Sequence, residues 1–247
     1  MDRMLYVAMS GARQAMAQQA TVANNLANAA TPGFRAQLDA SRAVPVVGAP
    51  PATRAFAVST TPGADFSPGP LGDTGRALDV AVDGDGWLAV QSPGGGEAYT
   101  RVGNLQIEAD GRVTTLAGRP VVGDAGELVI PPGATVTIAA DGTISARAPG
   151  EPQTGLAQVG RLKLVNPDSA ALVRGDDGLF RLRPGLAPAE ADPAVTVRSG
   201  VIEGSNVNPV EAMVAMIASG RSFEMQMKSI QTADEDARAA NRLLAHG

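Results

Sequence analysis

The hydrophobic positions of residues 4–34 follow a heptad-like pattern. Apolar and small residues recur at alternating steps of four and three, at Leu5, Met9, Ala12, Met16, Ala23 and Leu26, with Gln19 as the one polar member. This spacing predicts one side of an α-helix of about 26 residues, roughly 39 Å long at ~1.5 Å per residue. The helix is expected to end near Ala29 or Ala30, because Pro32 cannot continue it and biases Thr31 toward extended geometry.

A longer helix is predicted at the other end of the chain, from Pro209 to about Ala245. Asn208 is a favourable cap, Pro209 suits the first helical position, and Glu211 completes a capping-box pattern. At about 37 residues this helix is roughly 55 Å long. Its stripe again steps by three and four, through Met213, Met216, Gly220, Phe223, Met227, Ile230, Asp234, Ala237, Asn241 and Leu244.

The middle of the chain differs from the two ends in composition and in predicted secondary structure. Residues 35–77 are rich in proline and predict an extended connector with one edge strand at 54–59, and residues 78–203 predict an all-β module, a small sandwich or barrel. Asp-Gly turns separate its short strands, because glycine supplies the positive φ of tight hairpins. The strands are expected at 78–82, 87–91, 105–109, 112–115, 127–130, 135–139, 143–146, 160–165, 179–182 and 195–201. Turn sequences around Asp110-Gly111 and Asp141-Gly142 resemble each other and predict two independent hairpins.

Motifs for catalysis or ligand binding are weak. Residues 84–89 match a loose dinucleotide fingerprint, but the following residues continue as strand, which favours a hairpin turn at 83–86. Asp83 and Asp85 lack the remaining ligands of a calcium loop, and Asp176-Asp177 also favours a turn. Trp87 is expected in the core. The only histidine is His246, next to the last residue, so a hydrolytic triad is disfavoured.

Composition narrows the function classes further. The formal net charge is -5, Lys163 and Lys228 are the only lysines, and no basic stripe is present, which argues against nucleic-acid binding. The absence of cysteine excludes disulfides and thiolate metal sites. No apolar run is long enough to cross a bilayer, and the N-terminal pattern is not that of a secretory signal, so these features alone favour the cytoplasm.

Two long helical stripes imply more apolar surface than one small core buries. Met, Ala and Gly dominate both stripes; small residues permit close approach and Met adapts to different neighbours. We therefore favour assembly into a polymer over an ordinary antiparallel helix pair within a monomer. Asn24, Asn25 and Asn28 fit either a solvated helix end or amides that fix the register of neighbouring chains. Phe34 fits either a plug of the chain's own core or an anchor on a neighbouring subunit.

Several segments together resemble the bacterial flagellar rod and hook family. The N-terminal segments are Ala23-Asn24-Asn25-Leu26-Ala27-Asn28 and Thr31-Pro32-Gly33-Phe34-Arg35, the C-terminal one is residues 203–213, and residues 78–87 and 99–104 match the family's β domain. The resemblance covers essentially the whole chain. The modest connector before Leu78 is similar to the proximal-rod branch, with a distal-rod or hook-type relative as the alternative. Phe223 and Trp87 are mild departures from the pattern.

The resemblance implies an α+β fold in which long N- and C-terminal helices (1–34 and 204–247) form a coiled-coil-like assembly domain around the connector (35–77) and the β domain (78–203). It implies a non-enzymatic subunit without cofactor or metal, which assembles with copies of itself and other flagellar rod proteins and is exported by the flagellar type III apparatus without a cleaved signal. That implication replaces the cytoplasm with the flagellar basal body. A secreted glycan-binding β-domain protein or enzyme is the alternative from another class. The expected subunit-interface residues are Leu5, Met9, Ala12, Met16, Ala23, Asn24, Asn25, Leu26, Asn28, Phe34, Met213, Met216, Gly220, Phe223, Met227, Ile230 and Leu244.

Overall fold

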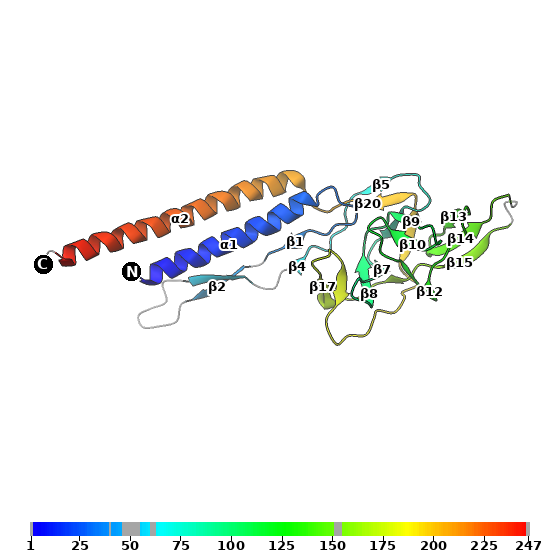
Figure 1. Cartoon of the computed structure of the whole chain (residues 1–247), viewed down its shortest axis with the longest axis horizontal. Helices are drawn as coiled ribbons and strands as arrows, with labels where there is room; N and C mark the ends of the chain where they lie inside the picture. The colour runs from blue at the N-terminus through cyan, green and yellow to red at the C-terminus, as the bar shows by residue number, and fades with distance from the viewer. Residues whose placement is uncertain (1, 40, 46–54, 60–62, 151–154, 246–247) are drawn as a thin grey trace. The chain divides into compact units, whose positions relative to one another are not determined.

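The protein is an α+β chain of two compact units, described here from a computed structural model (Figure 1). The structure describes residues 2–39, 41–45, 55–59, 63–150 and 155–245. Residues 1–29, 36–65 and 207–247 form one unit, called the helical unit below, and residues 30–35 and 66–206 form the other, called the β unit. The β unit thus takes in residues 66–77 and the segment around Phe34, which the sequence analysis assigned to the connector and to the N-terminal helical part.

The helical unit is built on two long antiparallel helices that lie side by side (Figure 1). Helix α1 spans Asp2–Ala27 and α2 spans Pro209–Ala245, close to the predicted bounds. Asn208 caps α2, since its side-chain oxygen accepts hydrogen bonds from the backbone N–H groups of Val210 at 3.0 Å and Glu211 at 3.4 Å. The prediction of an asparagine cap at this helix start is therefore confirmed.

In its described residues the helical unit also contains four short strands: β1 (Gln37–Leu38), β2 (Ser41–Pro45), β3 (Ala55–Ser59) and β4 (Gly63–Ala64). They form two antiparallel pairs, β1 with β4 and β2 with β3. Strand β3 contacts α1 and corresponds to the edge strand predicted at 54–59, of which residue 54 lies outside the described residues.

Sixteen strands and one short helical turn make up the described part of the β unit. In its first half the strands are β5 (Leu71–Asp73), β6 (Val80–Asp83), β7 (Trp87–Gln91), β8 (Glu97–Thr100), β9 (Leu105–Ile107), β10 (Val113–Thr115), β11 (Val122–Gly123) and β12 (Gly126–Glu127). In its second half they are β13 (Thr135–Ile138), β14 (Thr143–Arg147), β15 (Ala157–Arg161), β16 (Leu164–Val165), β17 (Leu172–Arg174), β18 (Phe180–Leu182), β19 (Thr196–Ser199) and β20 (Val201–Glu203), with the 3₁₀ turn η1 at Ser169–Ala171.

Antiparallel pairing joins strands that are distant in sequence. The largest described sheet has the order β16-β7-β8-β18-β17, and a three-stranded sheet has the order β13-β14-β15. Smaller pairs are β9 with β10, β11 with β12, β6 with β19, and β5 with β20. The last two pairs join the start of the unit to its end, so the chain closes on itself before α2 begins.

The two predicted Asp-Gly hairpins are confirmed and use the same turn chemistry. In the β9–β10 turn the Asp110 side chain accepts a hydrogen bond from the N–H of residue 112 at 3.2 Å, and Gly111 has a φ of 86°. In the β13–β14 turn Asp141 accepts from the N–H of Thr143 at 3.0 Å, and Gly142 has a φ of 83°. Positive φ at these positions is why glycine follows aspartate in both turns.

The hairpin predicted at residues 83–86 is wrong, although the chain does turn there. Strand β6 pairs with β19, whereas β7 pairs with β8 and β16, so the two strands that flank the turn belong to different sheets. Gly84 and Gly86 adopt φ values of 75° and 135°. The local sequence specifies a turn, but only the long-range pairing decides that it connects two sheets.

The core of the β unit gathers side chains from strands of several sheets and is filled mainly by aliphatic residues, as the 3% aromatic content requires. Trp87 is buried, as predicted, with its ring centroid 4.7 Å from that of Phe180 and 5.8 Å from that of Phe66. Fully buried aliphatic residues complete the centre, among them Leu88, Leu105, Ile130, Ile144 and Leu164.

Candidate assembly interface

Small side chains form the buried side of α1. Ala8, Ala12 and Ala15 are at most 8% exposed in the helical unit, where α1 packs on α2 and β3. A Cβ placed on Gly11 would lie 2.8 Å from the side-chain Cδ of Gln226 in α2, so the two helices approach closely at this point. On α2 the most buried described side chain is Ser219, at 3% exposed. Because small side chains fill the contact between α1 and α2, the larger apolar side chains of these helices lie on their other faces.

The large apolar side chains of both helices are mostly on the outside. In α1, Tyr6, Met9 and Met16 are 57%, 43% and 57% exposed. In α2, Met213, Met225 and Met227 are 53%, 63% and 39% exposed. Contiguous exposed apolar surface is characteristic of interaction sites rather than of isolated soluble proteins.

The predicted interface residues thus occupy different environments. Ala12 is buried within the helical unit, whereas Met9, Met16, Ala23, Asn24, Met213 and Met227 are exposed. Half-buried positions are Leu5, Asn25, Leu26, Asn28, Met216, Gly220, Phe223 and Ile230. The side chain of Leu244 lies outside the described residues, as does His246.

Two of the three asparagines at the C-terminal end of α1 and just beyond it, Asn25 and Asn28, make side-chain hydrogen bonds within their own chain. The Asn25 amide donates to the carbonyl oxygen of Gln37 at 2.9 Å and accepts from the N–H of the same residue at 2.8 Å. Asn28 donates to the carbonyl oxygen of Asn24 at 2.9 Å, at the end of the helix. Asn25 therefore fastens the connector to α1, a role that neither sequence interpretation included.

Sequence reasoning missed a second apolar group at the start of α2. Val210, Val214 and Ile217 are 67%, 63% and 58% exposed and, with Met213, have the i, i+3, i+4, i+7 spacing of one helix face. The signal was present in the sequence. It was overlooked because the heptad stripe through Met216 and Phe223 was followed along a neighbouring side of the same helix.

Phe34 is the last residue of a tight turn in the β unit. Thr31, Pro32, Gly33 and Phe34 form a turn closed by a 3.3 Å hydrogen bond from the Phe34 N–H to the Thr31 carbonyl, with Pro32 and Gly33 in the central positions. Gly33 has a φ of 66°, the positive value that such a turn requires. The Phe34 ring is 8% exposed and lies 4.3 Å below the guanidinium of Arg174. Its surroundings are those of the first alternative, a plug in the chain's own core.

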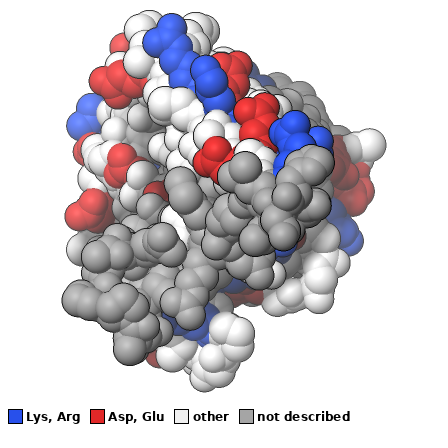
Figure 2. Space-filling model, turned by 90° about the vertical axis from the view of Figure 1, so that its left-hand side faces the viewer, with Lys and Arg blue, Asp and Glu red and all other residues white. Residues whose placement is uncertain are grey.

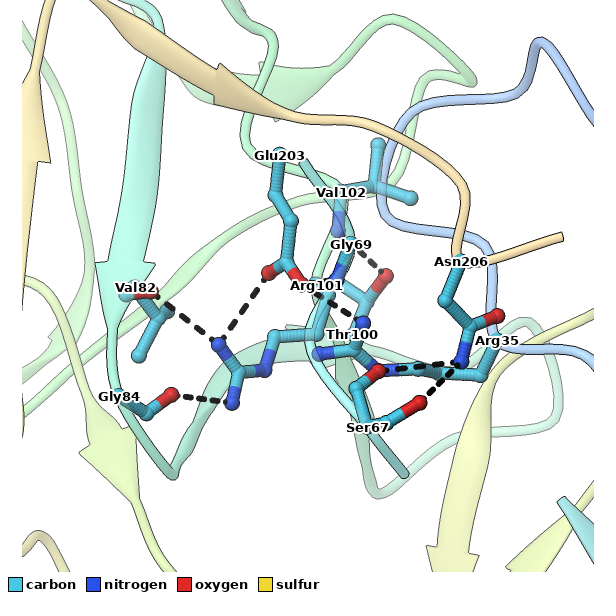
Figure 3. Close-up of polar contacts among 10 residues, drawn as sticks. All are labelled: Arg35, Ser67, Gly69, Val82, Gly84, Thr100, Arg101, Val102, Glu203 and Asn206. Carbon is cyan, nitrogen blue, oxygen red and sulfur yellow. Dashed lines mark hydrogen bonds and ion pairs between the residues drawn. The ribbon is translucent and has the colours of Figure 1, made fainter. Parts of the chain in front are cut away.

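A buried charge cluster joins the two ends of the β unit (Figure 3). Glu203, 1% exposed, pairs with Arg35 at 2.6 Å and with Arg101 at 3.2 Å, and those arginines are 1% and 5% exposed. Glu203 also accepts a hydrogen bond from the Gly69 N–H at 2.9 Å. One carboxylate thus offsets two buried guanidinium groups that come from distant parts of the chain.

Arg101 and Arg35 are held in different ways. Arg101 donates to the carbonyl oxygens of Val82 at 3.2 Å and Gly84 at 2.6 Å (Figure 3). Burial lowers the pKa of Arg101, and the charge of Glu203 opposes that change. The Arg35 guanidinium nitrogens, in contrast, have no aligned hydrogen-bond acceptor among the described residues, so Arg35 depends on its ion pair.

Chemistry typical of an active site is sparse in the described part of the chain. No group of three potential metal-ligating side chains was found there, and none of the helices is long and apolar enough to cross a membrane. A surface hollow of about 480 Å³ beside the loop 186–193 has carboxylates and apolar residues in its wall. Figure 2 shows Lys and Arg next to Asp and Glu on the face that it presents.

Comparison with known families accounts for both ends and the centre of the chain. Residues 5–35 match the family described as flagella basal body rod protein, residues 81–146 match the flagellar hook protein FlgE/F/G D1 domain, and residues 198–243 match the flagellar basal body rod FlgEFG protein C-terminal family. The flagellar basal-body rod protein FlgF of Escherichia coli is 54% identical over 250 residues, which cover 99% of each chain. The chain belongs to the FlgF family of flagellar basal-body rod proteins.

Other relatives fit this assignment. FlgF of Salmonella typhimurium is also 54% identical over 99% of both chains, and FlgF of Caulobacter vibrioides is 34% identical over 97% of both. The resemblance to the flagellar rod and hook family is confirmed, and the branch that the sequence analysis favoured over distal-rod and hook-type relatives is FlgF. The protein is accordingly a structural subunit of the flagellar basal-body rod.

Proposed function

We propose that this subunit polymerises through α1 and α2 and that the packed helices transmit torque along the rod. In this proposal the helices of neighbouring subunits form a coiled-coil-like inner layer, and the β unit forms a sandwich- or barrel-like body around it. Its partners are copies of itself and other flagellar rod proteins. The flagellar type III apparatus exports it without a cleaved signal, and its role requires neither catalysis nor a cofactor.

The observation that supports this proposal is the exposure of large apolar side chains on both helices. Tyr6, Met16, Val214 and Ile217 are each more than half exposed, while the side chains buried in the helical unit are small. Burying a large apolar side chain contributes about 1.5–3 kcal/mol. Neighbouring helices therefore gain substantial free energy by covering these residues. Identical contacts repeated about a helical axis would generate an open polymer.

A truncation tests whether the helices are the assembly element. We expect a fragment of residues 30–206 to retain the Trp87 core and unfold cooperatively, because it contains all of the β unit, including Phe34 beneath Arg174. The fragment should not enter rods or restore swimming to a strain that lacks the gene. Swimming supported by the fragment would contradict the proposal.

A point substitution tests the exposed surface without shortening the chain. Met16→Asp should block incorporation into rods while leaving the unfolding free energy within about 0.5 kcal/mol, since the residue is 57% exposed in the isolated subunit. The charge becomes costly only when a neighbour buries it unpaired. Gln18→Asp, an exposed position on the same helix, is the control and should assemble. Normal rods with Met16→Asp would argue against burial of this position.

A glycan-binding or enzymatic role for the β unit is the competing function from another class. The described hollow beside residues 186–193 is the feature that such a role would use. Glycan-array binding or substrate turnover by the 30–206 fragment would favour that role. We expect neither.

A further inference from the structure

We propose that three segments of the β unit act as a clasp, which holds the end of α1 close to the start of α2 and thereby favours the pairing of these helices within one subunit. The segments are residues 33–35, 67–70 and 203–206, called the clasp below. The inference goes beyond the proposed function, because it gives the β unit a role in the single subunit that does not depend on contacts between subunits.

Two backbone hydrogen bonds and one ion pair join residues 33–35 to residues 203–206. The Gly33 N–H donates to the carbonyl oxygen of Glu203 at 2.8 Å. The Asn206 N–H donates to the carbonyl oxygen of Phe34 at 3.2 Å. Beside these bonds Arg35 pairs with Glu203 (Figure 3), and the two side chains are 0% and 1% exposed. Breaking a buried pair leaves each charge without its partner, so the two segments stay together while the β unit is folded.

The third segment, residues 67–70, is bound at both of its ends. The Gly204 N–H donates to the carbonyl oxygen of Pro70 at 2.8 Å. The side-chain amide of Asn206 donates to the carbonyl oxygen of Ser67 at 3.0 Å (Figure 3). Between these bonds, a side chain on Gly69 would collide with the backbone carbonyl of Gly204. The chain therefore converges at the clasp each time it passes between the β unit and the rest of the molecule.

The clasp replaces a long connection between the helices with a short one. About 180 residues separate the end of α1 at Ala27 from the start of α2 at Pro209. When the clasp is closed, only residues 28–32 and 207–208 lie between the helices and the clasp. With the hydrogen-bonded bridge included, the effective connection is about nine residues long.

The end of α1 is also fastened beyond the clasp. The side-chain amide of Asn25 donates to the carbonyl oxygen of Gln37 at 2.9 Å, and its oxygen accepts from the N–H of the same residue at 2.8 Å. Gln37 follows Arg35 by two positions. The last turn of α1 is therefore tied to the chain on both sides of residues 33–35, which restricts the freedom of this helix end.

A short connection raises the equilibrium constant for pairing the helices. The entropic cost of closing a loop of n residues grows as (3/2)RT ln n, so a reduction from about 180 to about nine residues raises that constant roughly 90-fold. The helix contact itself is made by small side chains, among them Ala8, Ala12 and Ala15. Because each of these buries little apolar area, the pair gains much from a lower entropic cost.

Matched insertions in the full chain test the clasp. The first variant carries a flexible Gly/Ser linker of about 12 residues between Val207 and Asn208, where it lengthens the connection outside the clasp. The second carries the same linker between Gly94 and Gly95, in an exposed turn with open space around both glycines. Both insertions add the same length to the sequence between the helices, so they differ only in position relative to the clasp.

A disulfide between the helices measures their pairing. Gly11→Cys and Gln226→Cys are introduced together into each variant, since the chain has no other cysteine and these positions are in contact. The equilibrium of this disulfide with glutathione gives the effective concentration of one thiol at the other. The linker after Val207 lengthens the connection from about nine to about 21 residues and should lower that concentration about three- to fourfold. The linker after Gly94 should change it by less than about 1.3-fold.

The comparison between the two insertions decides the outcome. Equal effective concentrations in both variants, whether lowered or unchanged, would overturn the proposal, because the position of the linker relative to the clasp would then have no effect. Urea unfolding followed by the fluorescence of Trp87 should be the same for both variants. A shift of that transition in the first variant alone would place residues 207–208 within the clasp and overturn the connection described here. These measurements use the isolated subunit, so their result is independent of whether the protein forms rods.

Discussion

Replacing Glu203 by glutamine should destabilise the β unit strongly. The substitution keeps the volume of the side chain but removes the carboxylate that lies 2.6 Å from Arg35 and 3.2 Å from Arg101. Two guanidinium groups then remain buried without a counter-charge. Removing one partner of a buried ion pair costs about 3–5 kcal/mol, because the remaining charge is not resolvated. For a unit of this size the loss corresponds to a fall in Tm of about 6–20 °C.

Urea unfolding followed by the fluorescence of Trp87 measures this loss directly. Trp87 is the only tryptophan, it is 5% exposed, and its ring lies 5.6 Å from the Arg101 guanidinium. Asp83→Asn is the control, since the Asp83–Arg198 pair is 41% and 56% exposed and should contribute less than about 1 kcal/mol. If Glu203→Gln unfolds within about 1 kcal/mol of the wild type, the carboxylate does not offset the buried arginines and the reasoning fails.

Three further predictions concern local features. Asn208→Ala should remove about 1 kcal/mol from the start of α2 and lower the helical circular dichroism; an unchanged spectrum and unfolding curve would exclude the cap. Gly103→Ala would place a Cβ 1.6 Å from a backbone carbonyl oxygen of β6 and should cost at least about 1–3 kcal/mol, whereas Gly94→Ala, with open space around it, should unfold like the wild type. Hydrogen bonds from Arg181 lower the pKa of Asp177 below its ordinary 3.8. The contribution of Asp177 to the stability of the folded protein is therefore present above pH ~4 and is lost as the pH falls through the lowered pKa. The difference in unfolding free energy between wild type and Asp177→Asn should shrink on acidification, and a constant difference would contradict this.

Local sequence signals predicted the elements that local interactions determine. The start of α2 was predictable because Asn208, Pro209 and Glu211 each act within one turn of helix. The Asp110 and Asp141 hairpins were predictable for the same reason, since the aspartate and the following glycine define the turn between adjacent strands. Composition also predicted an aliphatic core.

Interactions between distant residues were not predictable in this way. Arg101 and Glu203 are 102 positions apart, and nothing in either neighbourhood indicates that they pair. Strand β8, at Glu97–Thr100, was missed because it is short and its partners β7 and β18 define it. The division of α2 into an inner and an outer side likewise required the contact between Gly11 and Gln226, because an amphipathic pattern does not identify which neighbour covers each side.

The chain crosses into and out of the β unit at neighbouring points. The Gly33 N–H donates to the Glu203 carbonyl at 2.8 Å, and the Asn206 N–H donates to the Phe34 carbonyl at 3.2 Å. A folded segment whose two ends meet is readily inserted, enlarged or exchanged within a host chain. Evolution can therefore remodel the middle of such a subunit without altering the spacing of the terminal helices, and an engineer can graft a reporter of similar end-to-end distance at the same point.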